Sequence, residues 1–373
     1  MTFTVQGWCP GALRPMMSGD GLVVRIRPRM ARLTVEQAQG LAFAALHHGN
    51  GLIDLSARAN IQLRGVRPDA HAALLADLDR LGLIDPDEAS EAHRNIVVTP
   101  FWTEGDSTAQ IVAALTDVLQ APAYGHLPGK FGFAVGPAAV LDNVSADIRI
   151  SPVPKGWLVR PDQFDCGAIA LAGDVAGLVH KLLDWFLASG GVQNGRGRMA
   201  GLSPMDAQLP PGFTHIPVLE PIRPIHPGPH ALGTLVALEF GQMHANLLAD
   251  LATAPLRVTP WRMLLLEGAV APQHPGLISD PHDPRLRVTA CTGAPGCPQA
   301  LQPTRDLARL LAAQVLPGQH LHVSGCAKGC AHPGPADLCL VANMTGFDII
   351  PNGRASAVAS GRFDAATPLF KAL

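Results

Sequence analysis

Four cysteines near the end of the 373-residue chain have the type and spacing of a metal-cluster site. Five residues separate Cys291 from Cys297, and three residues separate Cys326 from Cys330. Four thiolates are the ligand set of iron–sulfur clusters. Glycines beside these cysteines allow tight turns and free backbone amides, which can donate hydrogen bonds to sulfur. The pattern therefore predicts one 4Fe–4S cluster held by the four side chains.

Two other interpretations of the four cysteines stay open. A zinc ion also accepts four thiolates, although structural zinc sites more often use pairs with two intervening residues. The four could instead be buried free thiols, but two close pairs in glycine-rich segments are not typical of those. Cys9, Cys166 and Cys339 each stand alone. A lone cysteine usually serves as a small buried apolar residue.

The composition favours a globular protein and excludes two classes of partner. Apolar residues make up 47% of the chain and charged residues 16%, and the formal net charge is −2. Such a chain can form folded cores, but it has no positive field for nucleic acid or an anionic membrane. No apolar run is long enough to span a bilayer, and residues 1–10 carry no export signal. Together with the odd number of cysteines, these features predict a reducing, cytoplasmic setting.

Arginine supplies most of the positive charge, since only five of the 28 basic residues are lysine. This bias reflects either genome composition or a use of the planar arginine fork, which binds carboxylates through two parallel hydrogen bonds. Arg25 and Arg27 are two residues apart in a predicted strand, so their side chains point the same way. In a cleft they would form a carboxylate clamp, whereas on a sheet edge they would be hydrated.

Proline and glycine divide the chain into four predicted parts. Residues 209–230 are rich in proline and have no apolar period, which is typical of an extended connector. This connector and the order of the predicted elements place the domain limits at 1–87, 88–208, 209–280 and 281–373.

The first and third parts show the same order of predicted elements. Each has a strand, a helix and two further strands, at 22–27, 34–48, 51–56 and 61–66 and again at 232–239, 242–252, 256–259 and 263–267. The segments LSARANIQL and VTPWRMLLL fall at the same point of each series. Repetition of a whole unit indicates duplication. The second and fourth parts each add an αβ segment, with strands at 95–99, 287–290 and 321–324 and helices at 107–120, 174–189 and 298–313.

These segments together resemble the sirohaem-type nitrite and sulfite reductase superfamily over nearly the whole chain. Besides the cysteine arrangement, residues 56–62, 94–97 and 127–131 carry the likeness. The resemblance implies an α+β fold with duplicated ferredoxin-like half-domains. It also implies two αβ domains of the nitrite/sulfite-reductase 4Fe–4S type, related by a pseudo-twofold axis.

Within that superfamily the chain resembles in particular the precorrin-3B synthase family of aerobic cobalamin synthesis. The likeness lies in residues 9–21 and in residues 322–333 around the second cysteine pair. Reductases of the superfamily commonly carry a lysine where this chain has Gly132, two residues after Lys130. This difference weakens the alternative function, a sirohaem-dependent assimilatory nitrite or sulfite reductase. A non-catalytic carrier of a tetrapyrrole or of an iron–sulfur cluster is a further alternative.

The resemblance implies an oxygen-dependent monooxygenase that converts precorrin-3A to precorrin-3B. A hydroxyl group is added at C20, and an acetate of ring A closes to a γ-lactone. The implied cofactors and partners are the 4Fe–4S cluster, a mononuclear non-haem iron, NADH or NADPH, O2, the tetrapyrrole substrate and an electron-donor protein.

The resemblance also implies a set of site residues. Arg94 and Lys130 are expected in catalysis, and Arg58 and Gln62 are expected to bind the substrate, together with Arg25 and Arg27, which are inferred from their spacing on the predicted strand. Histidines such as His322 and His332 flank the second cysteine pair. None of the histidines forms a recognised ligand spacing with a carboxylate, so no ligand of a mononuclear iron is predicted.

Overall fold

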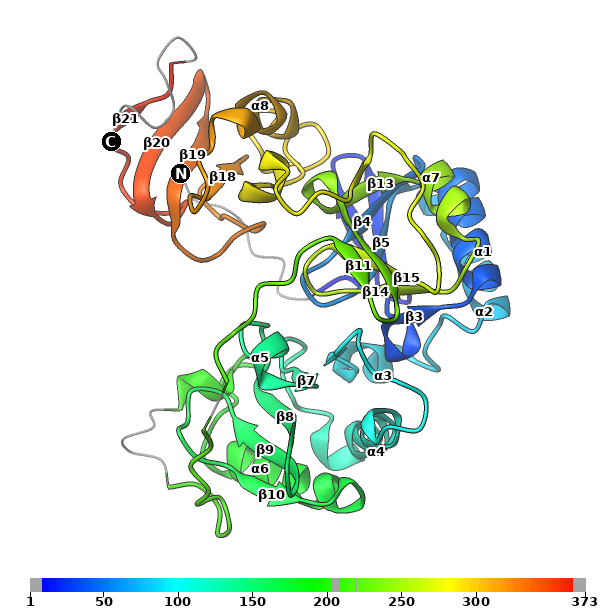
Figure 1. The fold of residues 1–373 in the computed structure, drawn as a ribbon, viewed down its shortest axis with the longest axis vertical. Coiled ribbons are helices and arrows are strands. Elements are labelled where there is room, and N and C mark those ends of the chain that lie inside the picture. Colours follow the sequence, from blue (N-terminus) through cyan, green and yellow to red (C-terminus); the bar gives the residue numbers. More distant parts are fainter. Residues whose placement is uncertain (1–8, 203–207, 219, 365–373) are drawn as a thin grey trace.

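The computed structural model describes residues 9–202, 208–218 and 220–364, which form three bodies (Figure 1). A central body holds two sheets, A and B. An αβ unit around sheet C lies toward the bottom of Figure 1, and an αβ unit around sheet F, which carries the four cysteines, lies toward the top. Residues 1–8, part of the segment in which no export signal is expected, lie outside this description. No helix among the described residues is long and apolar enough to cross a membrane.

Sheet A forms the first half-domain, with two helices against its apolar face. Its strand order is β1-β2-β5-β4-β13. The elements are β1 (Met16–Ser18), β2 (Gly21–Ile26), β4 (Leu52–Leu55), β5 (Ile61–Val66), β13 (Gln242–His244), α1 (Val35–His48) and α2 (His71–Arg80). Thr34 caps α1 and exchanges hydrogen bonds with Gln37 in a capping box, which fixes the helix start at the predicted residue.

Sheet B forms the second half-domain, with the order β11-β12-β15-β14-β3, and β16 also pairs with β12. The elements are β3 (Arg32–Leu33), β11 (Gly228–His230), β12 (Gly233–Leu238), β14 (Leu256–Val258), β15 (Met263–Glu267), β16 (Leu277–Ile278) and α7 (Ala245–Leu251). Each half gives one strand to the other, since β3 pairs with β14 and β13 pairs with β4. This exchange interlocks the halves around one apolar core.

Local geometry repeats between the two halves. Ser56 Oγ accepts two backbone N–H bonds of 3.1 and 3.3 Å within its turn, and Thr259 Oγ1 does the same at 3.2 and 3.3 Å. Met30 and Phe240 share a left-handed conformation, with φ of 54° and 53°. Helix α1 has 14 residues and α7 has 7, a difference of about two helical turns. The duplication predicted from the sequence is therefore present in the fold.

The two αβ units share one topology. Sheet C runs β6-β7-β8-β9-β10 and sheet F runs β17-β18-β19-β20-β21, each with three parallel strands followed by two antiparallel ones. Around sheet C lie β6 (Ile96–Val98), β7 (Phe133–Val135), β8 (Ile148–Val153), β9 (Gly156–Pro161), β10 (Ala168–Ala170), α3 (Glu88–His93), α4 (Thr108–Gln120), α5 (Ala138–Leu141) and α6 (Val175–Ala188). Around sheet F lie β17 (Val288–Ala290), β18 (Leu321–Ser324), β19 (Ala336–Asn343), β20 (Gly346–Gly353), β21 (Gly361–Arg362) and α8 (Arg305–Leu311).

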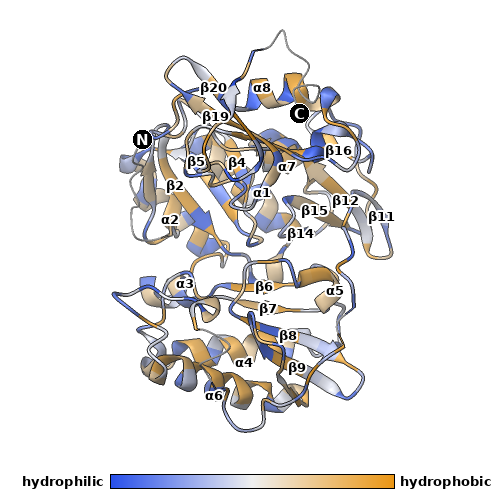
Figure 2. Ribbon diagram, turned by 90° about the vertical axis from the view of Figure 1, so that its left-hand side faces the viewer, coloured by the Kyte–Doolittle hydropathy of each residue, from blue (hydrophilic) through white to orange (hydrophobic). Residues whose placement is uncertain are grey.

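Apolar helix faces complete the cores of these units. Helices α4 and α6 are coloured largely as hydrophobic where they lie beside sheet C (Figure 2). Their buried side chains form one cluster with Phe133, Ile148 and Val159 of the sheet. A smaller cluster joins α8 to the parallel strands of sheet F. The burial of one helix stripe against a sheet is what the 3.6-residue apolar period of these segments requires.

Two predicted helices are wrong in part. Residues 242–252 begin as strand β13, because their first three residues pair with β4 of the other half. The helix predicted over 298–313 begins only at Arg305, and Pro303 disfavours a helical conformation in the residue before it. The domain limits at residues 87, 208 and 280 stay predictions, and the strand exchange places a short piece of each half in the sheet of the other.

Candidate functional site

The four cysteines lie in two loops at the carboxyl ends of neighbouring parallel strands. Cys291 directly follows β17, and Cys326 comes two residues after β18, its hydrogen-bonded neighbour. Loops at this edge of a parallel sheet meet in space. The backbone N–H of Gly325 donates to Cys291 Sγ at 3.1 Å, so one loop contacts the ligand sulfur of the other.

The chemistry of this donor set fits an iron–sulfur cluster. A Cβ at Gly325 would lie 2.7 Å from Cβ of Ala300 and 3.4 Å from Cys291 Sγ, so glycine is needed for the amide to reach sulfur. Burial raises the pKa of the Cys326 and Cys330 thiols, and metal binding displaces the proton from such groups. Among the residues described, no group of three or more His, Cys, Asp or Glu gathers closely enough for a single metal ion. A cluster offers each thiolate its own iron, so its ligands need not meet on one ion.

Two arginines of the central body hold the cysteine loops. Arg64 donates to the carbonyl oxygen of Gly296 at 2.8 Å, and Ser18 Oγ donates to the same oxygen at 2.6 Å. Arg262 donates to the carbonyl oxygen of Ala331 at 3.0 Å, next to the second cysteine pair. Both loops are thus fixed to the half-domains by charge-assisted hydrogen bonds.

A row of polar side chains crosses the outer face of sheet A. Strand pairing aligns Gln242, Asp54, Gln62 and Arg25 across β13, β4, β5 and β2. Gln242 donates to Asp54 at 2.8 Å, and Arg25 donates to Gln62 Oε1 at 2.9 and 3.3 Å. Arg64 lies two residues beyond Gln62 on β5 and faces the same way. These five residues, called the polar row below, extend from Arg25 to the first cysteine loop.

Arg58 lies at one end of this surface, in the turn between β4 and β5. Its Nη2 donates to the carbonyl oxygen of Lys130 at 2.9 Å, while the Lys130 side chain itself is exposed. Burial lowers the pKa of Arg58, and the positive charges of Arg198 and Arg25 lower it further. Burial also lowers the pKa of Arg25. The structure therefore brings the predicted residues Arg25, Arg58, Gln62 and the backbone of Lys130 into one neighbourhood.

Arg94 and Arg27 are held by carboxylates of the scaffold. Arg94 donates two bonds of 2.8 Å to Asp85 and a third of 2.8 Å to the carbonyl oxygen of Arg27. The Arg27 side chain is buried and lies 3.4 Å from Glu91. Burial and the charge of Arg25 lower its pKa to about 10. Both arginines border a cavity of about 320 Å³ against α4, but the fork of Arg94 is already used by Asp85.

The comparisons with known proteins agree with this architecture. The model of the nitrite/sulfite reductase ferredoxin-like half domain matches residues 14–81. The fold is similar to the NirA protein of Mycobacterium tuberculosis, with a TM-score of 0.63 at 17% identity, over 92% of this chain and 77% of that chain. A precorrin-3B synthase of a Sinorhizobium species is 31% identical over 410 aligned positions, which cover 96% of this chain and 85% of that protein. The chain belongs to the precorrin-3B synthase family. It is therefore an enzyme, and its duplicated ferredoxin-like halves are confirmed.

In this member of the precorrin-3B synthase family, three histidines gather beside the second cysteine loop. The ring centroid of His332 lies 4.5 Å from that of His320 and 5.7 Å from that of His322. Burial lowers the pKa of His322 to about 3 and that of His320 to about 4, so both are neutral at neutral pH. His322 Nε2 is buried without a hydrogen-bond partner. The lone Cys339 is buried as expected, whereas Cys9 and Cys166 are partly exposed.

Sequence reasoning missed several residues that build the site. Arg64 follows Gln62 by two positions in a predicted strand, so the period that paired Arg25 with Arg27 could have identified it. Arg262 and Arg198 come from a turn and from a glycine-rich loop. No periodicity places such residues, and only the fold brings them next to the cysteine loop and to Arg58.

Proposed function

We propose that the chain is an oxygen-dependent monooxygenase of cobalamin biosynthesis that converts precorrin-3A to precorrin-3B. The supporting observation is the polar row, which links Arg25 to the cysteine loop held by Arg64. A reduced tetrapyrrole carries many carboxylate side chains, and guanidinium groups bind carboxylates in two-pronged hydrogen bonds. A macrocycle bound on this surface lies beside a source of single electrons.

The proposal gives each residue of the site a defined task. Arg58 and Arg25 bind substrate carboxylates, and Gln62 orients Arg25 through its Oε1. The exposed ammonium of Lys130 neutralises a further carboxylate beside Arg58 or passes a proton to it. Arg94 acts indirectly: it holds the backbone at Arg27, and Asp85 holds Arg94 in place.

The cofactors follow from the donor groups and from the reaction. Cys291, Cys297, Cys326 and Cys330 hold a 4Fe–4S cluster, which supplies electrons one at a time. One oxygen atom of O2 enters the C20 hydroxyl group and the other leaves as water. NADH or NADPH provides the two electrons, directly or through a donor protein, and the acetate of ring A closes the lactone. A mononuclear non-haem iron is part of the proposal without assigned ligands, as is a cytoplasmic location.

A sirohaem-dependent reductase is the second candidate, because the fold is similar to NirA. Cations around a bound oxyanion stabilise the charge that develops during its reduction. Position 132 offers none, since Gly132 has no side chain and its backbone N–H donates to Asp147. This favours a tetrapyrrole that is bound as substrate and released as product over one that stays as cofactor.

Oxygen labelling of the product tests the function. The cluster-loaded protein is purified without oxygen from a host that makes sirohaem and is then mixed with precorrin-3A and reduced nicotinamide. Admission of ¹⁸O2 should give a product with one labelled oxygen, at the C20 hydroxyl and not in the lactone. Tightly bound sirohaem at one per chain, together with nitrite or sulfite reduction, would overturn the proposal.

A further inference from the structure

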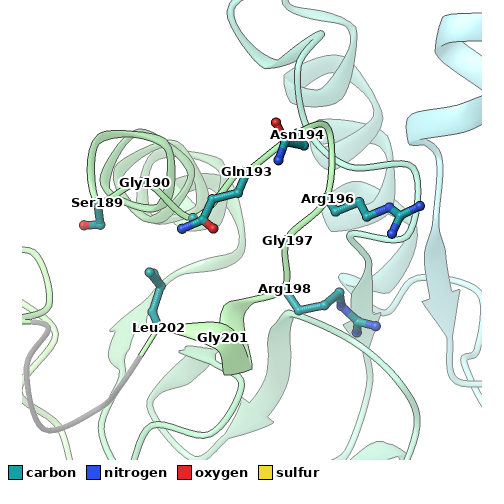
Figure 3. A pocket seen from close by; sticks show the side chains of 10 residues that line it. Ser189, Gly190, Gln193, Asn194, Arg196, Gly197, Arg198, Gly201 and Leu202 are labelled. Atoms are coloured by element: carbon teal, nitrogen blue, oxygen red, sulfur yellow. The ribbon is translucent and has the colours of Figure 1, made fainter. Parts of the chain in front are cut away.

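A glycine-rich loop after helix α6 carries two more arginines of the first αβ unit, Arg196 and Arg198. The loop borders a cavity of about 600 Å³, which none of the cysteine loops reaches. Figure 3 shows the side chains of Arg196 and Arg198 extending in the same direction, away from the helix end at Ser189. Arg196 is exposed, and the side chain of Arg198 is 35% exposed.

A buried carboxylate fixes Arg198 in place. Asp147 is 1% exposed, and its two oxygens accept Arg198 Nε at 2.8 and 2.9 Å. The same carboxylate accepts the backbone N–H groups of Met199 at 2.8 Å and of Gly132 at 2.9 Å. Arg198 Nη2 donates to Ser145 Oγ at 3.1 Å. Asp147 therefore ties the loop of Arg198 to the turn that holds Gly132.

Gly132 lies close to Arg58 and shares the acceptor Asp147 with Arg198. A Cβ at position 132 would stand 3.7 Å from Arg58 Nη1 and 3.2 Å from the carbonyl oxygen of Asn95. A side chain at position 132 would crowd the carbonyl oxygen of Asn95 and contact Arg58 Nη1, so the glycine leaves this side of Arg58 Nη1 uncovered. No hydrogen bond to another described residue uses Arg58 Nη1 or Arg198 Nη1.

Positive charge gathers at Arg58. Burial is the main cause that lowers the pKa of Arg58, and the positive charges of Arg198 and Arg25 lower it further, while Cys9 and Asp147 act in the opposite direction. The Asp147 carboxylate is already used by Arg198 Nε and two backbone amides. Partly buried cations that repel each other are stabilised when an anion joins them.

We propose that Arg198 binds a carboxylate of the tetrapyrrole jointly with Arg58, beside Gly132. This inference rests on the proposed function, because the anion it requires is a side chain of the substrate. The inference makes the glycine-rich loop part of the binding site. It also means that Arg198 supplies the positive charge that Gly132 cannot supply for binding a polycarboxylate. A purely structural role for Arg198 would tie the loop to Asp147 and leave substrate affinity unchanged.

Binding of a fluorescent porphyrin separates the two roles. Uroporphyrin, a polycarboxylate, is titrated into the cluster-loaded wild type and into the variants Arg198→Ala, Arg198→Lys and Arg223→Ala. Arg223 is the control, because it is exposed and pairs with Glu220 in the connector. The expected result is an about tenfold to hundredfold loss of affinity for Arg198→Ala, a smaller loss for Arg198→Lys, and none for the control. The loss should shrink as salt is raised.

The outcomes distinguish the two proposals. Arg198→Ala protein with an unchanged melting temperature and an affinity within twofold of wild type would overturn the inference and leave the proposed function standing. Wild-type protein that binds neither uroporphyrin nor precorrin-3A would overturn the proposed function itself. If Arg198→Ala does not fold, Arg198→Lys decides the matter, because it keeps one charge and loses the two-pronged geometry. Affinity equal to wild type in that variant, at low and high salt alike, also contradicts the inference.

Discussion

The two half-domains have equivalent rows of four residues across their sheets, but the side chains in the two rows differ in polarity. In sheet A the row consists of Gln242, Asp54, Gln62 and Arg25. The equivalent row of sheet B consists of Arg32, Arg257, Leu265 and Leu235. The apolar end of the second row is buried in a cluster that covers the outer face of sheet B. This face of the sheet is therefore buried and apolar in the second half-domain, whereas it is polar in the first.

The ion pairs beside the two rows are inverted in charge. Arg64 on β5 lies 3.7 Å from Asp54 on β4, whereas Glu267 at the equivalent place on β15 accepts from Arg257 on β14. Arg64 continues to the first cysteine loop. Arg257 instead donates to two carbonyl oxygens at residues 100 and 102 of the first αβ unit. The duplicated sheets therefore use the same pair of positions to dock two different αβ units, with the docking arginine on opposite members of the pair.

The two αβ units differ in the same manner. The central row of sheet F holds Thr289, His322 and Cys339, and the matching row of sheet C holds Val97, Ala134 and Arg149. The cysteine loops follow β17 and β18, and the loops after β6 and β7 carry no cysteine. The scaffold is thus present twice, whereas the four clustered cysteines and the polar row each occur in one copy. The following experiments test that division of labour.

The largest effect is expected for the cysteines, because loss of one thiolate leaves the cluster incomplete. Cys326→Ser should abolish the brown colour and the conversion of precorrin-3A together. Its matched control is Cys166→Ser, the cysteine of the other αβ unit, which should keep iron, sulfide and turnover. Iron and sulfide analysis with an activity assay measures both. A Cys326→Ser protein with full iron, full sulfide and normal turnover would contradict the assignment of Cys326 as a cluster ligand.

The next contrast separates two arginines that are both predicted site residues, Arg94 in catalysis and Arg58 in substrate binding. Arg94→Ala removes the partner of Asp85, whose side chain is 5% exposed, and a buried carboxylate left alone costs about 3–5 kcal/mol of unfolding free energy. Arg58→Ala breaks only a bond to a carbonyl oxygen, so its stability should change by less than about 1 kcal/mol. Its affinity for the tetrapyrrole should instead fall by about tenfold to a hundredfold.

Urea unfolding and isothermal titration on both variants measure this contrast. If Arg94→Ala protein unfolds as wild type does yet binds the substrate poorly, Arg94 belongs to the binding site and not to the scaffold. Unchanged affinity in Arg58→Ala would remove Arg58 from it. The pair therefore tests the division between scaffold and site within the first half-domain.

Much of this fold could be predicted from the sequence, because local signals agree with the tertiary structure. The capping residue Thr34 and the apolar periods of α4 and α6 place their elements correctly, whereas the cluster predicted from the cysteine spacing stays a prediction. Strand β13 could not be predicted, because its three residues become a strand only by pairing with the other half. The position of Arg198 near Arg58 could not be predicted either, because it depends on how two separate segments of the chain pack.

A swap between equivalent row positions is expected to have a smaller effect. Leu265 is fully buried, and Leu265→Gln places an amide in an apolar cluster, so the unfolding free energy should fall by about 3 kcal/mol. Gln62→Leu puts the apolar residue of sheet B on the open face of sheet A. Its unfolding free energy should change by less than about 1 kcal/mol, while Arg25 loses its Oε1 partner and substrate affinity falls several-fold. Equal destabilisation by both swaps would contradict the different roles of the two faces.

The smallest expected effect concerns His322, the buried central residue of sheet F. Its pKa is lowered to about 3 by burial and by the positive charge that His332, His320 and Arg262 would add. A histidine in the unfolded chain has a pKa of about 6.5. Between about pH 3 and pH 6.5 the unfolded state therefore binds a proton at His322, and the folded state does not. The stability associated with neutral His322 is thus fully present above pH 6.5 and is lost as the pH falls. Sheet C has Ala134 at the equivalent place and cannot respond in this way.

Unfolding experiments between pH 7.5 and pH 5.0 measure this dependence in cluster-loaded protein. One histidine contributes a slope of at most about 1.4 kcal/mol per pH unit. His322→Gln keeps a polar side chain that cannot titrate, so its unfolding free energy should fall less steeply with acid than that of wild type, whatever its stability at pH 7.5. His320 keeps its own contribution, because its pKa is also lowered, to about 4, and some slope therefore remains in the variant. Identical slopes for wild type and His322→Gln would show that His322 is protonated in the folded protein, because a protonated, buried side chain would lose no stability on acidification.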